Sequence, residues 1–173
     1  MIIISLLMDD IIIFTDGSTL NNQNKGSRKG GVGVFFGDND ERNISISLEE
    51  SDNNKVTNQV AELLACVKGI ETLVTGQKIN KKIIIYTDSM YIVNMMKSWA
   101  DKWVKNDWKK SDGKEVLNLD LVKKLYYYSK NLNIEFRHVR SHTKEPSKSD
   151  PNYKIWYGNM QADKLAVEAS NLI

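Results

Sequence analysis

Hydrophobic and polar positions follow two different periods along the chain. Residues 11–15, 31–37 and 42–48 are short runs, either apolar or alternating between apolar and polar, and polar or glycine-bearing stretches separate them. Such runs are typical of β-strands, and the short turn at 38–41 predicts that the last two pair as a hairpin. Together the three runs predict an antiparallel meander.

From residue 57 onward the pattern becomes helical. Apolar residues recur at three- and four-residue spacing from 60 to 74, with Thr57 or Asn58 as the N-cap and Gly76 as the stop. The remaining strand-like and helical runs are, in order, 82–87, 90–106, 118–129, 134–139 and 158–171. Strands alternating with helices after a meander predict an α/β fold with a mixed sheet, in a single domain over residues 1–173.

Two predicted strands have almost the same sequence, IIIFTD and IIIYTD, and each places an aspartate, Asp16 or Asp88, at its carboxyl end. Ligands of open α/β sheets bind at that edge, and two carboxylates held side by side repel each other unless a cation lies between them. If the strands are neighbours, the pattern favours a divalent-cation site. The alternative is that each aspartate caps the turn that follows it, which is a frequent role for this residue.

Other candidate groups are individually unremarkable. Glu62 lies in the first turns of the first helix, off the centre of its apolar stripe, and Asp163 lies near the start of the last helix, where acids are common. His138 and His142 share the segment HVRSHT at a strand end, where a histidine is usually a surface group but can shuttle protons. The glycines of GGVGVFFG lack the spacing of a cofactor-binding loop, so we interpret them as a bulge or a close strand approach.

Residues 98–114, SWADKWVKNDWKKSDGK, hold three of the four tryptophans, Trp99, Trp103 and Trp108, among five lysines. Lysines interleaved with indoles suit a phosphate backbone, with the aromatic faces against sugars or bases. The other interpretation is an amphipathic helix end whose tryptophans pack on the core, and the spacing of Trp99 and Trp103 suits that equally. Both interpretations stay open at this point, and both can hold.

The net charge of the chain is a weaker argument against nucleic-acid binding than it first appears. The chain carries 24 basic and 22 acidic side chains, and a net charge of +2 argues on its face against a nucleic-acid-binding protein. However, residues 1–100 carry 10 basic and 12 acidic side chains, whereas residues 101–173 carry 14 basic and 10 acidic side chains. The near-neutral total therefore averages over an acidic part and a basic part and does not exclude nucleic-acid binding.

The lone Cys66, expected in or near the core, excludes an intramolecular disulfide and a zinc site built from cysteines.

No run of residues approaches the ~18 apolar positions of a membrane-spanning helix. The apolar N-terminal extension, residues 1–8, lacks the basic flank and the cleavage pattern of a signal peptide. We therefore expect an intracellular, cytoplasmic protein that does not bind membranes, with the nucleus as the alternative compartment.

In their order and context, several motifs resemble those of type 1 ribonuclease H, the bacterial and eukaryotic enzyme that cuts the RNA strand of RNA/DNA hybrids. They are TDGS, TNQVAELLA, YTDSMYIVN, the W-x3-W-x4-W-K segment, HVRSHT and ADKLA. The resemblance runs from about residue 11 to residue 169. It implies a five-stranded mixed sheet with the order 3-2-1-4-5, which puts the strands of Asp16 and Asp88 next to each other.

The resemblance also implies the site residues. The family's four acidic metal ligands map onto Asp16, Glu62, Asp88 and Asp163, and its histidine for product release or proton transfer maps onto His142. Its contacts to the RNA strand map onto Asn58, Gln59 and Met90. Its contacts to the DNA strand map onto Lys55, Thr57, Tyr91, Trp99, Trp103, Ser111 and Asn118.

By this resemblance we expect a monomeric endoribonuclease that hydrolyses the RNA strand of hybrids with two Mg²⁺ ions, Mn²⁺ being the alternative, and leaves 5′-phosphate and 3′-hydroxyl ends. Two other readings are a non-catalytic nucleic-acid-binding module on the same scaffold and the nuclease domain of a reverse transcriptase. Two departures from the family are visible. Lys55 stands where an arginine is common, and the connection from His142 to Asp163 is longer than in the family pattern.

Overall fold

The computed structural model describes residues 10–20, 28–51 and 55–172, so the N-terminal extension 1–8 lies outside the described residues. Five strands form one mixed sheet in the order β3-β2-β1-β4-β5, which confirms the expected class and order. The antiparallel meander consists of β1 (Ile11–Leu20), β2 (Lys29–Phe35) and β3 (Ile44–Glu49). The parallel half adds β4 (Ile83–Thr87) and β5 (Ile134–His138).

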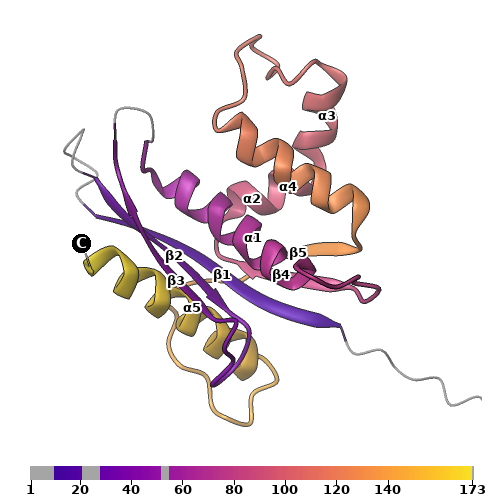
Figure 1. Ribbon diagram of the computed structural model, residues 1–173. Coiled ribbons are helices and arrows are strands. Elements are labelled where there is room, and N and C mark those ends of the chain that lie inside the picture. Colours follow the sequence, from indigo (N-terminus) through magenta and orange to yellow (C-terminus); the bar gives the residue numbers. More distant parts are fainter. Residues whose placement is uncertain (1–9, 21–27, 52–54, 173) are drawn as a thin grey trace, which may run out of the picture.

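Helices cover both faces of this sheet (Figure 1). On one face α1 (Asn58–Val74) lies against β1 and β2, and α4 (Leu119–Asn131) packs on α1. On the other face α5 (Tyr153–Asn171) crosses β1, β2 and β3. Successive strand residues point to opposite faces, so Ile13 and Ile85 belong to the core under α1, and Phe14 and Tyr86 to the core under α5. No helix in the described part of the chain is long and apolar enough to cross a membrane.

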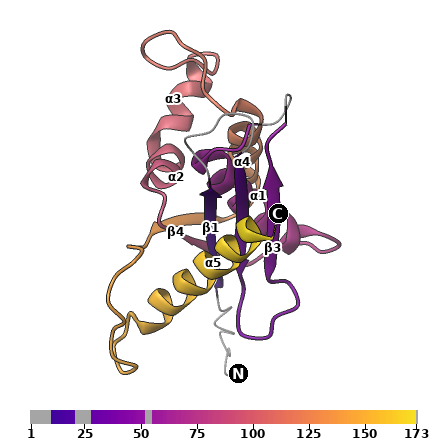
Figure 2. The same ribbon diagram turned by 90° about the vertical axis from the view of Figure 1, so that its left-hand side faces the viewer.

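A helical arm projects away from the sheet. The predicted helix 90–106 is present as three consecutive pieces, α2 (Met90–Asn94), a π-helical segment η1 (Met95–Trp99) and α3 (Ala100–Lys105). Figure 2 shows α2 and α3 rising from the sheet toward an irregular loop at the top of the view. The arm therefore carries residues 98–114 away from the sheet while its base stays in the main core through the buried Met95.

The glycines of β2 bring α5 onto the sheet. A Cβ added to Gly31 would lie 1.9 Å from the carbonyl oxygen of Ala166, and one added to Gly33 would lie 2.1 Å from that of Ala162. The pairing of β2 with β1 and β3 continues through both glycines. The expected bulge is therefore wrong, whereas the close approach at these glycines is present and is made by the α5 backbone against the strand.

The start of the last helix also differs from the expectation. The sequence predicts a start at residue 158, whereas α5 begins at Tyr153. Asp150 closes a turn there, because its side chain accepts a hydrogen bond from the Asn152 amide at 2.7 Å and its carbonyl accepts one from the Tyr153 amide at 3.0 Å. Gly158 lies inside the helix, where an added Cβ would come within 2.3 Å of the Phe14 ring. This glycine serves packing and is not a helix boundary.

Candidate active site

Strand register brings Asp16 and Asp88 together. The parallel pairing of β1 with β4 runs from Ile11 with Ile83 to Thr15 with Thr87, so IIIFT and IIIYT align residue for residue. Asp16 and Asp88 come directly after this parallel pairing, at the edge where β4 ends. Asp88 follows the end of β4 as predicted, whereas Asp16 is not at a strand end, because β1 continues to Leu20 in its pairing with β2. The strands are thus neighbours, which was the condition for a shared cation site.

Glu62 reaches the same edge from the first turns of α1. The Thr57 hydroxyl accepts a hydrogen bond from the Val60 amide at 3.2 Å and begins the helix, as predicted. Gly17 permits the approach of the helix, because an added Cβ there would lie 2.4 Å from the Glu62 amide nitrogen. As a result, carboxylate oxygens of Asp16, Glu62 and Asp88 all lie within 4.8 Å of one another.

Burial makes this acidic edge unfavourable without a counter-charge. The pKa of Asp16 rises to about 9, first through burial, then through the charges of Glu62, Asp88 and Asp163 and a hydrogen bond with Asp163. The pKa of Glu62 rises to about 8 through burial and repulsion by Asp88, and a hydrogen bond with Thr87 opposes this rise. Oε2 of Glu62 is buried and has no hydrogen-bond partner among the described residues.

This donor set fits a divalent cation. Carboxylate oxygens are the preferred ligands of Mg²⁺, Mn²⁺ and Ca²⁺, and a buried oxygen without a donor is what a bound cation would satisfy. Asp16, Glu62 and Asp88 are the residues that would hold it, with Asp163 beside Asp16. The divalent-cation interpretation therefore accounts for more of the geometry than the turn-capping alternative.

Asp163 comes to this edge from α5, in the opposite layer. It lines a small cavity of about 80 Å³ together with His142, which lies in the loop after β5 with a positive φ of 51°. The structure thus places His142 beside Asp163 in spite of the long connection between them. The other histidine, His138, lies at the end of β5 with Nε2 3.2 Å from the carbonyl oxygen of Asp88.

Sequence reasoning missed Asn159, which lines the same small cavity. Its side chain is buried, and its Oδ1 has no hydrogen-bond partner among the described residues. The available signal was its position one helical turn before Asp163, which places both side chains on one face of α5.

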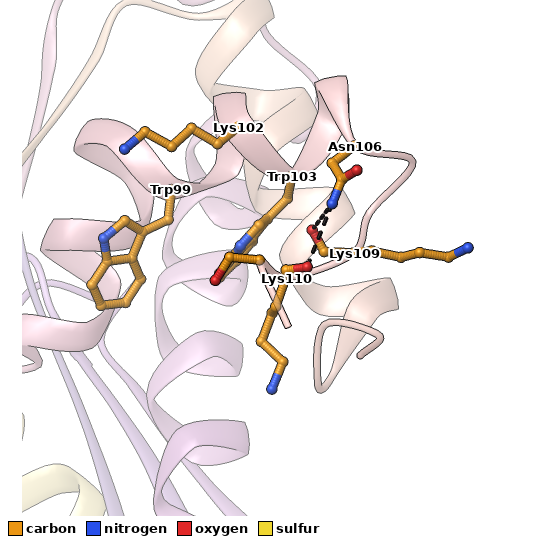
Figure 3. A pocket seen from close by; sticks show the side chains of 7 residues that line it. Trp99, Lys102, Trp103, Asn106, Lys109 and Lys110 are labelled. Atoms are coloured by element: carbon orange, nitrogen blue, oxygen red, sulfur yellow. Dashed lines mark hydrogen bonds between the residues drawn. The ribbon is translucent and has the colours of Figure 1, made fainter. Parts of the chain in front are cut away.

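The helical arm carries the second candidate surface, the tryptophan–lysine hollow (Figure 3). It has a volume of about 480 Å³ and is lined by Trp99, Lys102, Trp103, Asn106, Lys109, Lys110 and Ser111. The ring of Trp99 lies 5.9 Å from that of Tyr91 and 6.1 Å from that of Trp103, centroid to centroid. The structure therefore brings Trp99, Trp103 and Ser111 together at one hollow, with Tyr91 beside Trp99. Their contact with the DNA strand stays a prediction.

Trp108 behaves differently from the two tryptophans of the hollow. Its ring meets that of Tyr126 edge-on at 5.6 Å, and the Lys123 ammonium lies 5.4 Å from its centroid. It packs against α4 and does not line the hollow. Trp99 and Trp103 are half-buried against the main core as well, which confirms the core interpretation for them, while their contact with a nucleic-acid backbone stays a prediction.

The remaining predicted contact residues gather at helix starts. Lys55, Asn58 and Gln59 are exposed around the start of α1, and Asn58 Oδ1 accepts a hydrogen bond from the Thr19 hydroxyl. Met90 is 46% exposed at the start of α2. Asn118 precedes α4 in a left-handed conformation, with φ 54°, and its side chain makes no capping hydrogen bond.

Comparison with known proteins identifies the family of this chain. The RNase H family model matches residues 8–171. Ribonuclease H1 of Homo sapiens is 35% identical over 166 residues, which cover 96% of this chain and 52% of the human protein. Ribonuclease H of Schizosaccharomyces pombe is 36% identical over 160 residues, which cover 91% of this chain and 52% of that protein. The chain thus spans about half the length of these two relatives.

The fold agrees as well. The crystal structure of LC9-RNase H1, a type 1 RNase H with the type 2 active-site motif, superposes with a TM-score of 0.69. Its sequence identity is 23%, and the match covers 95% of this chain and 74% of that one. From the family match and these relatives, the chain belongs to the RNase H family, as a type 1 member.

Proposed function

We propose that this chain is an endoribonuclease that hydrolyses the RNA strand of RNA/DNA hybrids with two Mg²⁺ ions. The observation that carries the proposal is the convergence of Asp16, Glu62 and Asp88 on one sheet edge, with Asp163 reaching it from the opposite layer. The two relatives named ribonuclease H1 and ribonuclease H support the assignment. A non-catalytic binding module would have no use for a buried, mutually repelling cluster of this kind.

When bound, the ions would lower the pKa of the attacking water and stabilise the leaving 3′ oxygen, which gives 5′-phosphate and 3′-hydroxyl ends. The chain's own part is to fix the carboxylates, and three different elements do so. Asp16 lies in β1, Asp88 follows the paired strand β4, and Glu62 is held by α1. His142 is exposed beside Asp163, where its imidazole would exchange a proton with solvent as the product leaves.

Specificity would come from reading the 2′-hydroxyls of one strand and the deoxyriboses of the other. For the RNA strand we propose Asn58, Gln59 and Met90, at the starts of α1 and α2. For phosphates of the DNA strand we propose Lys55, Thr57 and Asn118. The tryptophan–lysine hollow, with Tyr91, Trp99, Trp103 and Ser111, would follow the same strand further along. We expect the chain to act as a monomer.

One experiment tests this function directly. Labelled RNA/DNA hybrid, double-stranded RNA and double-stranded DNA of one sequence are incubated with the protein, with and without Mg²⁺, and the product ends are analysed. We expect Mg²⁺-dependent cleavage of the hybrid alone, with 5′-phosphate ends. The Asp16→Asn variant should bind the hybrid and leave it intact. Equal cleavage by this variant, or equal cleavage of double-stranded RNA, would overturn the proposal.

A further inference from the structure

The loop between β5 and α5 borders an open cavity that the proposed function does not use. It has a volume of about 490 Å³, and we call it the loop cavity. Apolar and aromatic groups wall it, namely Tyr86, Val139, Ile155 and Trp156, and two cations, Arg140 and Lys144, stand at it. The loop is drawn in orange beside the first turns of α5 in Figure 2.

The loop cavity adjoins the proposed active site. Arg140, Thr143 and Trp156 line both the loop cavity and the small cavity that holds His142 and Asp163. A strand lying at Asp163 would therefore reach the loop cavity by passing over these shared residues. Neither Asp16 nor the tryptophan–lysine hollow takes part in its lining.

The charge of the loop cavity favours an anion. Arg140 and Lys144 are exposed, and neither forms an ion pair with a carboxylate of the described residues. The lining also contains one acid, Asp150, but its carboxylate already accepts the hydrogen bond from the Asn152 amide that closes the turn before α5. The lining therefore contains two cations without an ion pair among the described residues, and one carboxylate that already accepts a hydrogen bond.

The walls favour a flat, partly apolar group. The indole of Trp156 is held in place, because its Nε1 donates to the Thr143 carbonyl at 3.2 Å and its ring lies 5.9 Å from that of Tyr153. A fixed aromatic face next to cations is the arrangement that binds a base together with its phosphate. The volume lies within the roughly 300–1,000 Å³ of small-ligand sites, so one nucleotide fits.

We propose that the loop cavity binds an unpaired nucleotide of the RNA strand where that strand continues beyond the hybrid. The base would lie against Trp156, and the phosphate would lie between Arg140 and Lys144. This inference rests on the proposed function, because the cavity shares its lining with the site at which the RNA strand would be cut. The enzyme would then bind hybrids with a single-stranded RNA extension more tightly than blunt ones.

The first test compares substrates. The Asp16→Asn variant binds a blunt hybrid and hybrids of the same sequence with an RNA extension at the 5′ or the 3′ end, or a DNA extension at either end. We expect one of the RNA extensions to lower Kd about tenfold at moderate salt, and the DNA extensions to leave it unchanged. Equal Kd values for blunt and RNA-extended hybrids would overturn the inference, as would an equal gain from DNA extensions.

The second test compares two lysines of the same loop. Lys144 lines the loop cavity and Lys148 does not, and both are exposed. The ratio of Kd for blunt over RNA-extended hybrid should fall about threefold in Lys144→Gln and stay unchanged in Lys148→Gln. If both variants change the ratio equally, the loop acts only through its overall charge and the inference is wrong. Absence of hybrid cleavage by the wild-type chain would overturn the proposed function instead, which separates the two failures.

Discussion

The acidic edge and the tryptophan–lysine hollow are built in opposite ways. The four carboxylates of the edge come from β1, α1, the end of β4 and α5, so their meeting depends on strand register and on helices in both layers. The lining of the hollow comes from a single stretch of chain, residues 99–111. The edge is therefore sensitive to distant substitutions that shift a layer, whereas the hollow responds mainly to changes within its own segment.

The two regions also differ in their electrostatics. The acids of the edge are largely withdrawn from water, which is why the pKa values of Asp16 and Glu62 rise so far. Of the lysines of the hollow, Lys102 and Lys109 are exposed and Lys110 is half-buried, so salt screens their charges more than those of the edge. Charge changes at the edge should consequently have large, local effects on catalysis, and those at the hollow should have smaller effects on affinity.

The largest expected effect is the loss of catalysis in Glu62→Gln. The substitution removes one charge of the edge and the buried, unpartnered Oε2. We expect kcat on a hybrid to fall about 10³-fold with KM within about twofold, which corresponds to several kcal/mol of transition-state stabilisation. Glu168→Gln, the same change at an exposed position of α5, should keep wild-type kinetics. Comparable kcat values for the two variants would contradict the role of the edge.

Next in size is the effect of Gly33→Ala, a substitution outside the site. A Cβ there would lie 2.1 Å from the Ala162 carbonyl oxygen, so α5 has to move away from β2. We expect the free energy of unfolding, measured in urea, to fall by about 3 kcal/mol, with a loss of activity because α5 carries Asp163. Gly37→Ala is the matched control, because nothing lies within 4 Å of its added Cβ. A change that leaves both stability and activity intact would refute the close packing of α5.

A smaller effect is expected from the tryptophans of the arm. Trp103→Ala removes a wall of the hollow and should raise Kd for the hybrid about tenfold. Trp108→Ala removes the contact with Tyr126 and should lower the melting temperature while leaving hybrid affinity near that of the wild type. If instead Trp103→Ala changes only stability, the hollow is a packing feature and does not bind substrate.

The smallest effect concerns the metal-free protein at different pH. The pKa values of Asp16 and Glu62, about 9 and about 8, lie above the ordinary values of 3.8 and 4.5, so the native state binds more protons than the unfolded state between these limits. The free energy of unfolding should therefore fall as pH rises from about 5 to 9, by at least about 1 kcal/mol, or roughly 2–4 °C in melting temperature.

Thermal unfolding in the presence of a chelator measures this dependence. Added Mg²⁺ should reduce the loss, because cations bound at the edge favour the ionised carboxylates. The Asp16→Asn variant should show a flatter dependence, since one of the two groups no longer titrates. A melting temperature that is constant or rises with pH in the chelated wild type would contradict the burial of these acids.

Much of this arrangement could be predicted from local patterns. The duplicated IIIFTD and IIIYTD strands, the Thr57 cap and the helical period of α1 are set by neighbouring residues and give the fold class directly. The adjacency of Asp16 and Asp88 could not be derived in this way, because the order of strands depends on contacts between distant segments. For that order the family resemblance was needed, and the structure confirms it.

The errors have physical causes as well. Glycines in β2 and in α5 were interpreted through local conformation, as a bulge and as a helix start. Their actual role is to admit another element, either the α5 backbone or the Phe14 ring. Asn159 escaped notice because an asparagine within a helix has no distinguishing pattern, and only its burial without a partner marks it. Sequence periodicity thus predicted the elements but not the contacts between the helix layers and the sheet.

The π-helical segment η1 has a consequence for how this arm can vary. A π turn holds one more residue than an α turn, so η1 sets the residues beyond it back by about 100° around the helix axis relative to an uninterrupted α-helix. Ile92 and Met95 keep their places in the core, while Trp103 is turned about the helix axis. Deletion of a single residue within η1 would restore continuous α-helical geometry. The tryptophan–lysine hollow would then rotate about the helix axis without a change in the sheet. The segment thus sets the rotation of the tryptophan–lysine hollow about the axis of the arm, relative to the core that holds the base of the arm.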